Sequence, residues 1–230
     1  MCGRFTLSTP AGVIAEQFQL IDVPTLSPRY NVAPTQPVAA VRHAPGNGGR
    51  ELALLRWGLI PFWAKDPAIG SRMINARSET VAQKPAFRAA FRQRRCLVVA
   101  DGFYEWQRQE FGKQPFYIRL RDEKPFAFAG LWEHWEGSGD ATIDSCTLLT
   151  TEPNDLVRLL HNRMPVILAP QDYDLWLDPG VQEAELLQPL LRPYPSQDMI
   201  AYPISTWVNS PTNEGPQCIE PLAEQKPLNL

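Results

Sequence analysis

Proline is the feature that most limits what this chain of 230 residues can fold into, because its 23 prolines are spread over the whole length. A proline ring removes a backbone donor and clashes with the preceding turn of a helix. The sequence therefore disfavours long helices and predicts short elements joined by fixed turns. With 44% hydrophobic residues, the chain can still bury a substantial core without disulfides or metals.

Short runs of apolar residues outnumber the helical patterns. We expect strands over 38–42, 51–55, 96–100, 115–120, 126–132, 146–151 and 164–168. Helices are expected over 9–20, 85–91, 154–160, 171–177 and 182–191. Because strands and helices do not alternate regularly, the pattern favours an α+β fold on a curved antiparallel sheet or barrel-like core with short flanking helices. No repeat or linker divides the sequence, so we predict one domain over residues 1–230.

Charge is unevenly distributed along the chain. The net charge of −3 argues mildly against a nucleic-acid partner. Between positions 72 and 95, however, Glu79 is the only acid among seven basic residues, which are Arg72, Arg77, Lys84, Arg88, Arg92, Arg94 and Arg95. Local potential governs phosphate binding, so this stretch predicts either a phosphate-binding face or an ordinary solvated helix face.

The cysteines and the hydropathy indicate a cellular compartment. Cys2, Cys96, Cys146 and Cys218 form no C-x-x-C pair, so neither a zinc site nor a redox motif is indicated, and the last three are expected to be inert buried thiols. Scattered thiols are typical of a reducing compartment. No run is long enough to span a bilayer. We therefore expect a cytoplasmic monomer without membrane contact, metal or other cofactor.

Cys2 directly follows Met1, and a small residue at this position generally permits removal of the methionine. An α-amine and a thiol would then stand on the same residue. The amine titrates near ~7.7–8.0, so roughly a tenth of it is neutral at pH 7. It can attack an aldehyde to form a Schiff base, and the thiolate can close onto the imine carbon as a thiazolidine. The alternative is that position 2 is merely where the chain starts.

Three further residues are candidates for the site, and two of them, Glu105 and His161, suit acid–base chemistry. Glu105 stands among aromatic residues, which can raise the pKa of a carboxyl group, although a surface glutamate on a strand is the alternative. His161 joins an expected helix to an expected strand, and a lone histidine is often structural. Asn75 lies in a polar segment without glycine or proline, which is not typical of a simple turn.

Two segments, 29–35 and 56–63, combine arginines with aromatic and turn residues. Side chains of this kind suit stacking or wedging against unpaired bases. The alternative is an ordinary core, because tryptophan and phenylalanine are usually buried.

Six motifs follow one another along the chain. They are Cys-Gly-Arg-Phe at 2–5, Tyr-Asn-Val-Ala-Pro at 30–34, Trp-Gly-Leu-Ile-Pro at 57–61, Ile-Asn-Ala-Arg-Ser-Glu-Thr at 74–80, Asp-Gly-Phe-Tyr-Glu-Trp at 101–106 and His-Asn-Arg-Met-Pro at 161–165. Together they closely resemble the SRAP family, the SOS-response-associated peptidases or abasic-site-processing proteins. The resemblance continues to positions 208–209 and 219–221, so it covers essentially the whole chain.

The resemblance implies that the protein crosslinks to abasic sites in single-stranded DNA through Cys2, which supplies both amine and thiol. It implies that Glu105 shuttles protons, that His161 assists sugar ring opening, and that Asn75 hydrogen-bonds near the reacting amine or sugar. No cofactor is implied. The residues implied in the DNA-binding cleft are Arg4, Asn31, Trp57, Arg77 and Arg163.

Other activities stay open from the sequence. A Schiff base acidifies the neighbouring sugar carbon, so strand cleavage by β-elimination is an expected lyase side activity, and autoproteolysis before Cys2 is another. A cysteine peptidase would act on peptides without DNA. A noncatalytic binder of single-stranded DNA would need the arginines but not Cys2.

One segment departs from the family pattern. In many relatives the loop after Val208 and Asn209 carries a basic residue, whereas here 210–215 reads Ser-Pro-Thr-Asn-Glu-Gly. A phosphate contact is therefore either missing there or supplied elsewhere, for example by Arg88 or Arg92.

Overall fold

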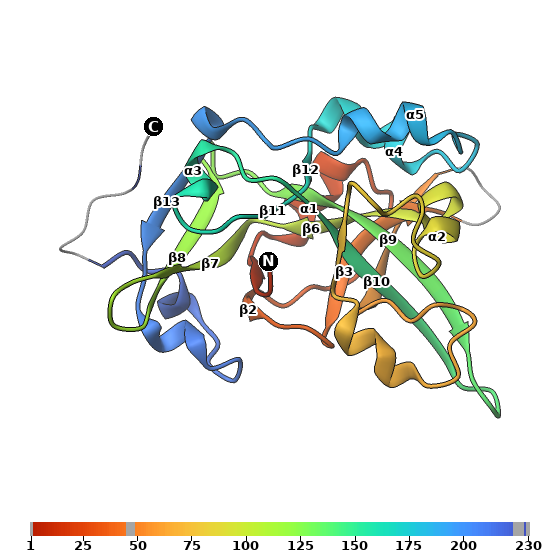
Figure 1. The fold of residues 1–230 in the computed structure, drawn as a ribbon, viewed down its shortest axis with the longest axis horizontal. Helices are drawn as coiled ribbons and strands as arrows, with labels where there is room; N and C mark the ends of the chain where they lie inside the picture. Colours follow the sequence, from red (N-terminus) through yellow and green to blue (C-terminus); the bar gives the residue numbers. More distant parts are fainter. Residues whose placement is uncertain (1, 45–48, 223–227, 229–230) are drawn as a thin grey trace.

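The computed structural model describes residues 2–44, 49–222 and 228, and Figure 1 shows the fold. Its centre is a barrel of five strands that pair in the order β10–β4–β3–β6–β9, with β9 pairing with β10 to close the ring. The barrel strands are β3 (Pro37–His43), β4 (Arg50–Trp57), β6 (Arg95–Ala100), β9 (Phe126–Glu136) and β10 (Thr142–Thr151). The predicted α+β class is confirmed, although β10 runs parallel to β4, so the barrel is not wholly antiparallel.

A second sheet packs beside the barrel, in the strand order β13–β8–β7–β1–β2. Figure 1 shows the first described residues in the middle of the molecule, between this sheet and the barrel strands β3 and β10. The strands of the second sheet are β1 (Phe5–Leu7), β2 (Arg29–Val32), β7 (Gly102–Arg108), β8 (Lys113–Leu120) and β13 (Met199–Pro203).

Three short strands extend the barrel along the last residues of β10 and the first residues of β9. β5 (Asn75–Arg77) runs parallel to β10, β11 (Met164–Pro165) pairs with β10, and β12 (Ile167–Leu168) pairs with β9. The expected strand over 164–168 is thus interrupted at Val166, whose N–H donates to the Leu149 carbonyl of β10 while its own carbonyl accepts from Ala129 of β9.

In the part of the chain that the structure describes, the helices are all short, as the prolines predict, and the longest α-helix has eight residues. No helix of the described residues is long and apolar enough to cross a membrane. The α-helices are α1 (Ala11–Phe18), α2 (Arg88–Gln93), α3 (Asp155–Arg158), α4 (Tyr173–Leu177) and α5 (Ala184–Leu187). The 3-10 turns are η1 (Pro67–Arg72), η2 (Pro170–Asp172), η3 (Gln188–Leu190), η4 (Ser196–Asp198), η5 (Thr206–Asn209) and η6 (Pro216–Cys218).

The strand β6 is buried at every position because it is covered on both faces. Successive side chains of a strand point to opposite faces. Cys96 and Val98 join a cluster that includes Phe5 and Ile118 of the second sheet, whereas Leu97 joins a cluster with side chains of the helices. Both faces of the strand are covered, so no position faces water.

Candidate active site

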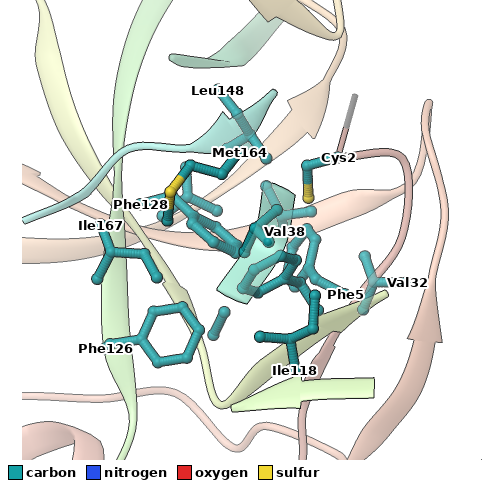
Figure 2. Close-up of a cluster of buried hydrophobic side chains, with 14 of the residues drawn as sticks. Cys2, Phe5, Val32, Val38, Ile118, Phe126, Phe128, Leu148, Met164 and Ile167 are labelled. Atoms are coloured by element: carbon teal, nitrogen blue, oxygen red, sulfur yellow. The ribbon is translucent and has the colours of Figure 1, made fainter. Parts of the chain in front are cut away.

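Cys2 is fully buried and precedes the first strand of the second sheet. Figure 2 shows it at the margin of the apolar cluster that fills the space between this sheet and the barrel. The Tyr104 N–H donates to the Arg4 carbonyl at 3.1 Å, and Phe5 pairs with Phe103, so β1 is held along β7. Met1, whose removal the predicted chemistry requires, lies outside the described residues.

The C-terminal end of β1 is held by one side chain, the carboxylate of Asp101. Asp101 accepts from the backbone N–H groups of Ser8 and Thr9, at 2.6 and 2.9 Å, and also from the hydroxyl of Thr6. Hydrogen bonds to an ionised acceptor are stronger than neutral ones. This anchor limits sliding of β1 and thereby fixes where Cys2 stands.

Asn75 reaches Cys2 from β5. Its Nδ2 donates to the Cys2 carbonyl at 2.8 Å, while the indole of Trp57 donates to the carbonyl of Ile74 at 2.9 Å and so holds the preceding residue. The buried Oδ1 of Asn75 has no hydrogen-bond partner within the described part of the chain. It is an acceptor suited to an amine or a sugar hydroxyl beside Cys2.

Glu105 lies on β7 with 2% of its surface exposed, and this burial raises the pKa of its carboxyl to about 7. Burial also raises the pKa of the Cys2 thiol, and the charge of Glu105 adds to this increase. The thiol is therefore protonated at neutral pH and needs a base. A carboxyl group that is about half ionised near pH 7 suits both the donation and the acceptance of a proton.

His161 lies between α3 and β11. The N–H of Arg163 donates to its Nδ1 at 3.0 Å, which assigns the proton of the neutral ring to Nε2. Burial lowers the pKa of His161, so the ring is neutral at pH 7. The side chain of Gln107 donates to the Leu159 carbonyl at 3.1 Å, which ties the segment before His161 to the strand that carries Glu105.

The three arginines implied in DNA contact differ in their exposure and in their hydrogen bonds within the protein. Arg77 is exposed on β5. Arg163 is paired with Glu79 at 2.6 Å. Arg4 donates to Asn31 Oδ1 at 2.7 Å and to the Val208 carbonyl at 3.0 Å. A phosphate contact by Arg4 stays a prediction, and it requires exchange of these internal partners.

Asn31 and Trp57 are both fully buried. Asn31 donates to the Ser210 and Asn213 carbonyls, at 2.9 and 2.8 Å, and so holds the loop after η5. In this arrangement neither side chain is placed for direct contact with DNA, and support of a DNA-binding cleft by these two residues stays a prediction. The segment 56–63 changes from buried to exposed after Pro61. Phe62 and Trp63 are 59% and 50% exposed, so they can present ring faces to bases.

A polar groove of about 650 Å³ opens beside His161, between the β7–β8 hairpin and α3. Arg108 and Lys113 face each other across this hairpin, and Arg158 projects from α3. All three cations are exposed. Sequence reasoning missed them because they are far apart in the chain. The only sequence signal for this cluster of cations was the change from apolar to polar residues at the end of β7.

The basic stretch does not form a single face. Arg95 is buried and donates to backbone carbonyls, and Arg94 pairs with the buried Glu133. Arg88 and Arg92 are exposed on α2, which Figure 1 shows well away from the first residues of β1. Neither the phosphate-face interpretation nor the solvated-helix interpretation therefore describes the whole stretch.

The described residues contain no group of three or more His, Cys, Asp or Glu side chains placed to hold a metal ion. The four cysteines are buried free thiols, as expected for Cys96, Cys146 and Cys218.

Comparison with known proteins agrees with these motifs. The family model described as SOS response associated peptidase (SRAP) matches residues 1–211. The abasic site processing protein YoqW of Bacillus subtilis (strain 168) is 46% identical over 224 residues, covering 96% of this chain and 99% of that protein. The abasic site processing protein HMCES of Xenopus tropicalis is 35% identical, covering 84% of this chain and 65% of that protein. A crystal structure of a protein from Bacteroides thetaiotaomicron superposes with a TM-score of 0.83 at 28% identity, covering 96% of this chain and 100% of that chain. This chain belongs to the SRAP family.

Proposed function

We propose that the protein processes abasic sites in single-stranded DNA by bonding Cys2 covalently to the ring-opened sugar once Met1 has been removed. The observation that carries this proposal is a single buried site that unites Cys2, the amide of Asn75 and a carboxyl group, Glu105, whose pKa is about 7. The relatives support the substrate, because they are abasic site processing proteins.

The first step is opening of the sugar. An abasic sugar is mostly a closed hemiacetal, so release of its aldehyde needs an acid and a base. The neutral imidazole of His161 and the partly ionised Glu105 meet that need. Asn75 Oδ1 accepts a hydrogen bond from the α-amine and orients it towards the aldehyde carbon.

The second step forms the two new bonds. The neutral amine adds to the carbonyl carbon, the resulting hydroxyl leaves as water after protonation by Glu105, and an imine remains. The sulfur then adds to the imine carbon while the thiol proton moves through Glu105 to the nitrogen. The balance is one aldehyde and one cysteine converted to one thiazolidine and one water.

Two side reactions accompany this proposal. Proton loss from the sugar carbon next to the imine gives β-elimination, so weak lyase activity is expected. Autoproteolysis is a proposed route to a free Cys2. General peptidase activity is the second candidate, since the family name contains it. The raised pKa of the Cys2 thiol disfavours it, because cysteine peptidases depend on a thiol whose pKa is lowered.

A denaturing gel tests the proposal. Purified protein is incubated with a single-stranded oligonucleotide that contains one abasic site, beside the same oligonucleotide with an intact base. We expect a band of reduced mobility that survives denaturation with the abasic oligonucleotide alone. Absence of that band, with intact mass confirming that the chain begins at Cys2, would refute the proposal.

The groove beside His161 gives a prediction about DNA affinity. Exchanging both Arg108 and Lys113 for glutamate is expected to weaken binding of single-stranded DNA by at least about tenfold, because phosphate contacts dominate such affinities. Fluorescence anisotropy at two salt concentrations measures the loss and the reduced salt dependence. Lys124→Glu is the matched control, since Lys124 is exposed but pairs with Asp122 away from the groove. An equal loss in both variants would show that the groove does not bind the strand.

A further inference from the structure

The guanidinium of Arg163 is held by a carboxylate rather than left open to ligands. Its Nη1 and Nη2 donate to the two carboxylate oxygens of Glu79, at 2.6 and 3.0 Å. Nη2 also donates to the Thr150 carbonyl at 2.6 Å. The guanidinium edge formed by Nη1 and Nη2 is thus fully used by an anion of this chain.

That edge is the part of arginine that recognises phosphate. The planar fork binds a carboxylate or a phosphate through two parallel hydrogen bonds, and it cannot bind both through the same edge. The Nε of Arg163 is buried without a hydrogen-bond partner among the described residues, so it provides no second exposed edge. A phosphodiester can therefore engage Arg163 through two parallel hydrogen bonds only by displacing Glu79.

The surroundings of Glu79 favour this exchange. Glu79 is half exposed, whereas the side chain of Arg163 is only 17% exposed, so the carboxylate can leave towards water while the cation stays. The hydrogen bond from Arg163 lowers the pKa of Glu79, which is therefore ionised at neutral pH. Arg77, two positions earlier, is exposed on β5, and its partner on β10 is the same Thr150. The two arginines and Glu79 are thus gathered at the end of β10.

We propose that Glu79 is a specificity-determining residue that competes with the phosphodiester backbone for Arg163. This inference rests on the proposed function. It means that undamaged single strands are held weakly, because each must displace the carboxylate. A strand with an abasic site is retained by the covalent bond to Cys2 instead. Glu79 thereby lowers the contribution of the phosphodiester backbone, which all DNA shares, to binding. Selection of a strand then depends more on the aldehyde of its abasic site.

The test uses Glu79→Gln and an undamaged single-stranded oligonucleotide, which cannot crosslink. Glutamine keeps a hydrogen-bond acceptor but loses the charge. We expect affinity to rise roughly three- to tenfold, as removal of a competing ion pair and of repulsion towards phosphate predicts. Glu152→Gln is the matched control, because Glu152 is exposed two positions beyond Thr150 and has no ion pair among the described residues. In an Arg163→Ala background, Glu79→Gln is expected to give no gain.

Three results would overturn the inference. Unchanged or weaker binding by Glu79→Gln would mean that Glu79 merely orients Arg163. An equal gain from Glu152→Gln, or a gain that persists without Arg163, would mean a general charge effect. The crosslinking gel with the abasic oligonucleotide is run in parallel. A wild-type crosslink without the affinity gain refutes the role of Glu79 alone, whereas absence of any crosslink refutes the proposed function.

Discussion

Glu105→Gln is expected to slow crosslink formation by about 10²–10⁴-fold, the usual contribution of a general acid–base residue. Glutamine preserves the shape of the buried side chain but can neither protonate the leaving hydroxyl nor accept the thiol proton. Because Glu105 is only 2% exposed, noncovalent affinity for undamaged single-stranded DNA should stay within about twofold. Single-turnover kinetics on denaturing gels measure the rate. A variant that retains the wild-type rate would remove Glu105 from the mechanism.

The same substitution is expected to stabilise the protein at alkaline pH. Burial raises the pKa of Glu105 from an ordinary 4.5 to about 7, so the folded state binds the proton more tightly than the unfolded state. The stabilisation of the folded state by this tighter proton binding is complete below about pH 4.5 and is lost as pH rises through about 7. At about pH 8 the buried charge then costs up to about 3 kcal/mol. Melting temperature should fall more between about pH 5 and about pH 8 in the wild type than in Glu105→Gln, and equal slopes would contradict this account.

Cys2→Ser is expected to abolish the stable crosslink completely. Serine is small enough to permit removal of Met1, so the α-amine remains, and only the thiol is lost. The variant should still form an imine, which borohydride reduction traps on the gel, but no adduct should survive denaturation without reductant. Cys218→Ser is the control, because that thiol is buried in a different cluster. A stable adduct of Cys2→Ser at wild-type yield would show that sulfur does not take part.

The motifs identify the candidate residues of the site, whereas the strands that carry these residues were not expected from the sequence. Asn75, Glu105 and Phe5 lie on β5, β7 and β1, and none of these strands was expected from the sequence. Two of them have only three residues, and polar motif residues hide the alternation that marks a strand. β13 and β2 were missed as well. The expected helix over 85–91 begins only at Arg88, because turns occupy the preceding residues.

Burial and pairing across long sequence separations account for the rest. A surface glutamate was the alternative for Glu105, and only the packing of β7 between β1 and β8 shows that it is buried. The bonds from Arg4 to the carbonyls of η5 span 204 and 205 residues, and the pair of Arg163 with Glu79 spans 84. The sequence shows that arginines are present, but only the tertiary structure shows which of them already have hydrogen-bond or ion-pair partners within the protein.

Mass spectrometry of the linked peptide tests the central claim most directly. The crosslinked protein is treated with a thiol-alkylating reagent under denaturing conditions, digested with protease and nuclease, and sequenced. We expect the sugar remnant on the peptide that begins at Cys2, with the Cys2 sulfur not alkylated, because a thiazolidine uses both amine and thiol. A remnant on any other residue, or a remnant on Cys2 with an alkylated sulfur, would contradict the claim.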